Sequence, residues 1–190
     1  NTALENIYVY AESVDTYKAK WSDYADKIVS NNKSNSDSIT FTYTSTDGKA
    51  INELNLNLVV KSNSYTNGVG TLVVYGTAIP DKAFYQCTTL KTITIPDSVT
   101  KIGSGAFNSC SNLTSVTIGN NVTTLGTNPF QRCPKLTEFN GKFASADKRC
   151  LMVDGYLNSF AIGCGLTEYA IPTSVTEIGS SAFYECSSLT

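Results

Sequence analysis

Apolar residues recur along the last two thirds of the chain with a fixed spacing. Phe84, Phe107 and Phe130 are 23 residues apart, and each is followed three residues later by a cysteine. Three residues further on, a leucine opens a run whose next marked positions lie at offsets of three and five. The runs are Leu90/Ile93/Ile95, Leu113/Val116/Ile118, Leu136/Phe139/Gly141 and, after a longer gap, Leu166/Tyr169/Ile171. Leu136 and Leu166 are 30 residues apart, so one repeat is enlarged by seven residues.

A repeat of this length predicts a β-rich solenoid of the α/β class. A single 23-residue unit cannot bury its own apolar face, whereas stacked units place the marked positions in one continuous core. Offsets of three and five put alternate side chains of a short strand on one side, so each turn contributes one strand to a parallel sheet. The Ala-Phe segments, such as Ala83-Phe84, are expected to form short helical or 3-10 turns on the opposite face.

The first 75 residues follow other patterns. Residues 1–29 begin with Leu4, Ile7 and Val9 at the array's offsets and continue with an apolar spacing of three or four from Val14 to Ile28. They predict the last strand of a preceding array and a capping helix. Residues 30–38, rich in Ser and Asn, predict a linker, and residues 39–75 alternate as in a β-meander cap. The array would occupy residues 76–190, with its enlarged repeat at 136–165.

One stretch of the array resembles a known family. Residues 93–103, which read ITIPDSVTKIG, lead into Gly105-Ala106-Phe107 and Cys110, and this combination resembles the BspA-type leucine-rich repeat. The resemblance covers residues 70–190 and implies a leucine-rich-repeat solenoid. Members of the family are exported surface proteins of anaerobic bacteria and some mucosal protists, and they are implicated in adhesion. The resemblance therefore implies an extracellular, cell-surface or secreted protein whose export signal lies outside this chain.

The enlarged repeat carries its own predictions. Asp154-Gly155 lies between two apolar runs and predicts a two-residue hairpin turn in a protruding hairpin. Cys87, Cys110, Cys133 and Cys186 recur with the repeat and are expected to be buried packing residues. The sequence does not decide whether Cys150 and Cys164 form a disulfide. Hairpin pairing places Cys150 near Ser159 instead of Cys164, so free thiols are favoured.

Composition argues against catalysis. The chain has no histidine and a net charge of −2, with 14 basic and 16 acidic residues. The absence of histidine removes Ser-His-Asp and Cys-His machinery and histidine-based zinc sites, and no nucleotide-binding or metal-binding motif is present. We therefore expect a protein that is not an enzyme, needs no cofactor or metal, and binds neither nucleic acid nor, within this segment, the membrane interior.

The outward side chains of the predicted sheet are the candidate binding residues. Solenoids commonly bind through this extended face, and irregular insertions are frequent contact points. The candidates are Val73, Tyr75, Thr92, Thr94, Ser115, Thr117, Glu138, Asn140 and Glu168 on the sheet, with Asp154 and Tyr156 on the hairpin. The expected partner is a protein, such as a host extracellular-matrix protein, or another cell surface.

Two alternatives and one further hypothesis accompany this interpretation. The array could be a spacer that displays other domains. It could instead be a carbohydrate-binding module that uses Tyr75, Tyr156 and Tyr169, although Tyr169 is expected to point inward. The chain also opens and closes within the repeat pattern, as expected for part of a longer protein, and its two ends could join head to tail between copies.

Overall fold

The computed structural model describes residues 7–9, 18–19, 23, 28–30, 37–55 and 58–190. The chain divides into two compact units, 1–38 and 39–190. In the first unit, β1 (Ile7–Val9) and β2 (Ile28–Ser30) form a parallel pair in which Ile7 lies opposite Ile28.

The structure differs from the predicted capping helix at the C-terminal end of that helix. Most of the segment from Val14 to Ile28 lies outside the described residues, as does Leu4 of the predicted strand, while Lys18 and Ala19 are helical. Ile28 begins β2 rather than ending a helix, because its backbone pairs with β1. Most of the predicted linker also lies outside the described residues.

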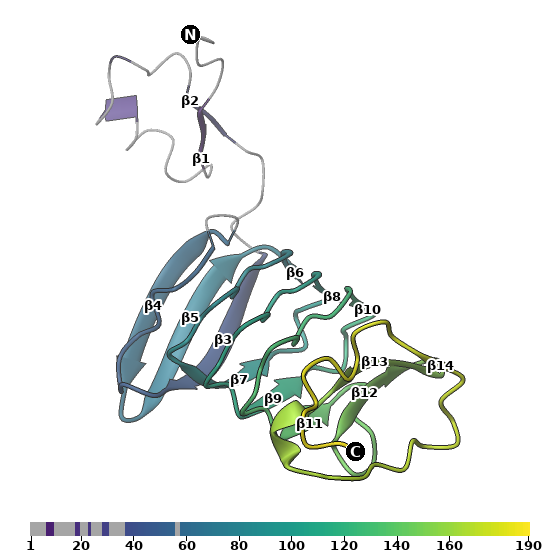
Figure 1. Ribbon diagram of the computed structural model, residues 1–190. Coiled ribbons are helices and arrows are strands. Elements are labelled where there is room, and N and C mark those ends of the chain that lie inside the picture. The colour runs from purple at the N-terminus through teal and green to yellow at the C-terminus, as the bar shows by residue number, and fades with distance from the viewer. Residues whose placement is uncertain (1–6, 10–17, 20–22, 24–27, 31–36, 56–57) are drawn as a thin grey trace, which may run out of the picture. The chain divides into compact units, whose positions relative to one another are not determined.

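A six-stranded sheet dominates the second unit (Figure 1). Its order is β11-β9-β7-β3-β5-β4. In β7, β9 and β11, parallel pairing joins residues 23 apart, as with Ile93 and Val116, so the sequence repeat is the structural repeat. The strands are β3 (Ser38–Ser45), β4 (Val60–Thr66), β5 (Val69–Tyr75), β7 (Leu90–Ile95), β9 (Ser115–Ile118) and β11 (Glu138–Gly141).

The strands before the array differ from the predicted meander. Consecutive strands of a meander are neighbours, but here β3 lies between β7 and β5, and β4 forms the edge. The alternation from Leu54 to Val60 forms no strand among the described residues; the strand there begins at Val60. β3 takes the inner position because Ile39, Phe41 and Tyr43 are buried, whereas the polar β4 can face solvent at an edge.

A charged side chain ties this cap to the array. The Glu53 carboxylate accepts hydrogen bonds from Thr88 Oγ1 (2.8 Å) and Thr89 N (3.0 Å). Desolvation by itself would raise the pKa of Glu53, but these hydrogen bonds outweigh it and lower the pKa below its usual value.

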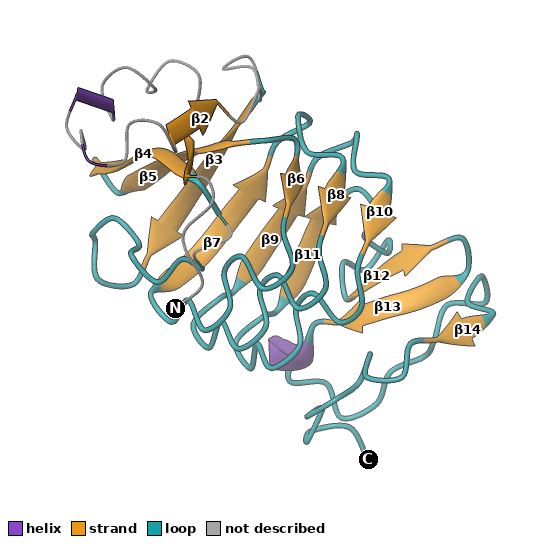
Figure 2. Cartoon of the chain, turned by 90° about the horizontal axis from the view of Figure 1, so that it is seen from above, coloured by secondary structure: helices purple, strands orange, loops and turns teal. Residues whose placement is uncertain are grey.

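The opposite side of the array consists of turns rather than the predicted short helices. Between the large sheet and these turns, each repeat also contributes a two-residue strand to a second parallel sheet: β6 (Ala78–Ile79), β8 (Lys101–Ile102) and β10 (Thr124–Leu125) (Figure 2). Around each Ala-Phe or Pro-Phe pair the chain forms successive β-turns, as where Cys87 N donates to Phe84 O. Gln86, Ser109 and Arg132 have φ near +60° (59°, 63° and 58°), and this left-handed conformation prevents a helix from continuing.

The core of the array is a set of ladders. The rings of Phe84, Phe107 and Phe130 stack nearly parallel, with centroids 4.8 and 5.1 Å apart. The repeat cysteines lie beside them, and Cys110 Sγ donates to Phe84 O at 3.0 Å. Burial raises the pKa of the Cys87 thiol to about 12, with a further contribution from Glu53. Cys87, Cys110 and Cys133 are therefore buried packing residues, as the sequence predicts, whereas Cys186 in the last turn is only partly buried.

The enlarged repeat contains the predicted hairpin, but the hairpin does not protrude. β12 (Cys150–Val153) and β13 (Tyr156–Phe160) are antiparallel, and Asp154 (φ 49°) and Gly155 (φ 84°) form the turn. β13 also pairs in parallel with β14 (Glu177–Ile178), so the hairpin takes the place that a two-residue strand holds in other turns. Its residues from Leu157 to Phe160 are buried as a result.

All six cysteines are free thiols. The disulfide between Cys150 and Cys164, which the sequence left undecided, is therefore not formed. The Cys150 sulfur lies 2.8 Å from the Tyr169 hydroxyl. Tyr169 thus points inward, as predicted, and packs in a second core cluster with Cys150, Phe160 and Phe183.

Candidate functional site

The outward side chains of the six-stranded sheet form two rows that cross its strands. Register places Thr42 beside Thr94, Thr94 beside Thr117 and Thr117 beside Asn140. The second row runs through Thr44, Thr92, Ser115 and Glu138 in the same way. Inward neighbours such as Ile93 and Val116 are buried, so alternation along the strands separates a core side from this hydroxyl-rich face.

Hydrogen bonds hold one end of the face in place. Glu138 Oε1 accepts from Ser115 Oγ (3.1 Å) and from Asn140 Nδ2 (3.1 Å). These bonds lower the pKa of Glu138 below its usual value, and the bond from Asn140 has the largest effect. The carboxylate is therefore charged at neutral pH. In the same row, the Oγ1 atoms of Thr44 and Thr92 lie 2.7 Å apart. The two rows therefore present a largely pre-positioned polar surface.

Sequence reasoning missed part of this face. Thr40, Thr42 and Thr44 of β3 point outward, and Thr40 and Thr42 are exposed. Their alternation with Ile39, Phe41 and Tyr43 is visible in the sequence, but nothing local indicates that β3 pairs with β7. Val73 and Tyr75 lie on β5, beyond β3, and the Lys61 ammonium lies over the Tyr75 ring at 5.4 Å.

Glu168 does not lie on this face. The predicted strand from Leu166 to Ile171 is not formed, and the sheet ends at β11 among the described residues. In the regular turns, Thr114 N donates to Lys91 O and Thr137 N donates to Thr114 O. The next backbone acceptor in this series is Thr137 O. It accepts a hydrogen bond from the Arg149 guanidinium instead of from a following strand, because the segment before the hairpin folds back on β11.

The hairpin candidates also lie away from the face. Asp154 is exposed at the turn, whereas Tyr156 is half-buried on β13 and its hydroxyl lies close to the backbone of Gly179. With Tyr169 in the second core, the three tyrosines named for the carbohydrate-binding alternative do not form one exposed group.

These features define the class of protein. The fold is a leucine-rich-repeat solenoid, with a parallel sheet on one side and turns on the other, and such solenoids are typically non-catalytic. The pattern of the BspA type leucine rich repeat region matches the chain in six copies, over residues 77–162 and 155–190. The chain therefore belongs to the BspA-type leucine-rich-repeat family.

Solved structures with similar chains carry related descriptions. A leucine-rich repeat protein of T. pallidum is 28% identical, with a TM-score of 0.40 over 61% of this chain and 51% of that one. A leucine rich cell surface protein from Faecalibacterium prausnitzii is 25% identical, with a TM-score of 0.34 over 62% and 42%. The pneumococcal vaccine antigen PcpA is 20% identical, with a TM-score of 0.39 over 60% and 36%. This chain thus spans about half or less of those proteins. No curated protein has a sequence that matches it significantly.

Two further findings concern the described residues alone. They contain no helix that is both long and apolar enough to cross a membrane. They also contain no group of three or more His, Cys, Asp or Glu side chains placed to hold a metal ion.

Proposed function

We propose that this chain is a non-catalytic, surface-displayed module that binds a protein partner through the outward face of the six-stranded sheet. The observation that carries the proposal is the pair of continuous rows, from Thr42 to Asn140 and from Thr44 to Glu138. Equivalent groups recur about every 4.8 Å across paired strands, so the face presents regularly spaced hydroxyl and amide groups. The partner class includes host extracellular-matrix proteins and the surfaces of other cells.

The two rows carry little charge, so the proposed binding does not depend on long-range electrostatic attraction. Within the two rows Glu138 is the charged residue, and the others carry hydroxyl or amide groups. Many short polar contacts over a rigid surface give modest affinity for each repeat, and repetition along a longer array adds avidity. Binding should therefore depend weakly on salt.

The test is surface plasmon resonance against fibronectin, fibrinogen, laminin and mucin. We expect saturable binding to at least one of them, and we expect Thr94→Lys together with Thr117→Lys to weaken it by about tenfold or more, because two long charged side chains would occupy the middle of the face. The matched control is Thr173→Lys, an exposed threonine outside the strands. Equal binding by both variants, or no binding to any protein, would favour the spacer function.

A second candidate function is head-to-tail association of copies. Ile171 and Ile178 of the last turn are 42% and 45% exposed, whereas Ile95 and Ile102, at the same repeat positions, are buried. The proposed occupant is the 1–38 unit of a second copy, because its run Leu4, Ile7 and Val9 has the offsets of an array strand.

Analytical ultracentrifugation over a range of concentrations checks this association. We expect dimers and longer species that Ile178→Lys converts to monomer, since a charge would replace an apolar contact. Val69→Lys, at an equally exposed valine in the cap (47%), should leave the association intact. A chain that stays monomeric at high concentration would remove this candidate.

A further inference from the structure

The stacking of turns is interrupted next to the enlarged repeat. In the regular part, Phe84 N donates to Ala106 O and Phe107 N donates to Pro129 O, which joins each turn to the next. The same bond recurs from Phe160 N to Ala182 O in the last two turns, but among the described residues none joins Phe130 to Ser159. The phenylalanine stack divides at the same place, since Phe160 packs with Phe183 in the second core.

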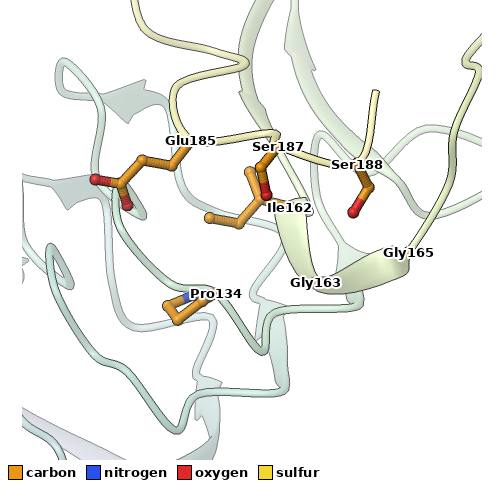
Figure 3. A pocket seen from close by; sticks show the side chains of 7 residues that line it. All are labelled: Pro134, Ile162, Gly163, Gly165, Glu185, Ser187 and Ser188. Carbon is orange, nitrogen blue, oxygen red and sulfur yellow. The ribbon is translucent and has the colours of Figure 1, made fainter. Parts of the chain in front are cut away.

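A cavity of about 430 Å³ opens at this interruption (Figure 3). Pro134 forms one wall, the 3-10 helix η3 (Ile162–Cys164) forms the floor, and the last turn forms the other wall. The floor is close to the wall because Gly163 N donates to Leu136 O at 2.8 Å, and a Cβ at Gly163 would collide with the backbone of Pro134. The lining residues are Pro134, Ile162, Gly163, Gly165, Glu185, Ser187 and Ser188.

The polar groups of the cavity are hydroxyls and one carboxylate. Ser187 and Ser188 are exposed, and in the described part of the chain their hydroxyls make no hydrogen bond. The Glu185 carboxylate lies 3.3 Å from Arg132 Nε, and both side chains are about half exposed (48% and 52%). Because Arg132 compensates the charge of Glu185, the cavity as a whole is close to neutral.

Apolar surface lies beside these polar groups. The Pro134 ring and the Ile162 side chain face the same space, as Figure 3 shows. Arg132, the ion-pair partner of Glu185, also donates from Nη2 to the Tyr184 hydroxyl at 3.0 Å, and its guanidinium carbon lies 5.3 Å from the centre of that ring.

We propose that this cavity binds a pyranose ring. Such a ligand is neutral and carries several hydroxyls that both donate and accept, which suits two unpartnered serine hydroxyls and a carboxylate that can accept from adjacent hydroxyls. It also has a C–H face that suits Pro134 and Ile162, and the volume lies in the range of small-ligand sites. The site uses no residue of the six-stranded sheet, so it is separate from the proposed protein-binding face.

Isothermal titration calorimetry tests the proposal on the whole chain. The probes are glucose, galactose, mannose and N-acetylglucosamine as free sugars, then a soluble polysaccharide and a glycoprotein-derived glycan, which distinguish the sources of the ring. We expect saturable binding of at least one probe and about a tenfold loss in the Ser187→Ala/Ser188→Ala variant, because two hydrogen bonds are removed. Glu185→Gln should weaken binding as well.

Two controls keep the result specific. Ser180→Ala, at an exposed serine outside the cavity, should bind as the unchanged chain does, and thermal unfolding should show that every variant is folded. Thr94→Lys/Thr117→Lys should also retain sugar binding, which separates this site from the sheet face. The absence of binding to every probe, or equal binding by the serine double variant, would overturn the proposal, as would a preference for simple alkylammonium ions over sugars.

Discussion

Gly141→Ala is expected to destabilise the array by about 3 kcal/mol or more. Gly141 ends β11 with φ of 81°, which costs an L-residue about 1–2 kcal/mol. An added Cβ would also overlap the carbonyl oxygen of Ile118. That oxygen accepts the backbone N–H of Lys142 at 2.9 Å, so relief of the overlap would break a bond between turns. Urea denaturation followed by circular dichroism would measure the loss.

Gly165→Ala is the matched control. Gly165 has a similar φ of 70°, but nothing lies within 4 Å of a Cβ at this position. Replacement of Gly165 by alanine should therefore lower the free energy of unfolding only through the strained backbone conformation, by about 1–2 kcal/mol. Equal losses for the two variants would show that the packing of β11 against Ile118 tolerates a methyl group.

Phe107→Ala should cost about 3–5 kcal/mol. Phe107 is fully buried and stacks on both Phe84 and Phe130, so its removal leaves a void in the middle of the ladder. Small domains are stable by only about 5–15 kcal/mol, so this single change removes a large share of the stability. Thermal and urea unfolding would both record it.

Phe183→Ala provides the comparison at the same position of the repeat. Phe183 is half-buried, and its ring is tilted by 35° to that of Phe160 instead of lying in a parallel stack. We expect a clearly smaller loss of stability than for Phe107→Ala. A loss as large as that of Phe107→Ala would mean that the second core contributes as much stability as the ladder.

The Gly141 and Phe107 variants concern how the proposed binding face is held, whereas Gly165 and Phe183 lie outside the six-stranded sheet. Glu138 and Asn140 lie on β11, directly before Gly141, and the rows of hydroxyls depend on the register of β7, β9 and β11. A variant that loosens this register should lose partner binding along with stability. Binding measurements on the face therefore need folded variants, which is why the lysine substitutions are placed at outward threonines.

Local periodicity was enough to predict the array. The 23-residue spacing of Phe84, Phe107 and Phe130 sets the length of chain in one turn, because equivalent residues must stack in one core. Alternation along each strand assigns Thr92, Thr94, Ser115 and Thr117 to the outward face, and the structure places them there. The Asp154-Gly155 turn is likewise local, since two residues with positive φ are enough to form it.

The tertiary structure decided which strands meet and where the sheet ends. The sequence shows that β3 is half-buried, but pairing with β7 depends on backbone groups about 50 residues away, and so do the threonines it adds to the face. Similarly, Leu166, Tyr169 and Ile171 have the spacing of an array strand, yet Arg149 occupies the acceptor on Thr137 that such a strand would use. A repeat pattern thus determines what each turn can bury, whereas competition for hydrogen-bond acceptors at the sheet edge determines which turns join.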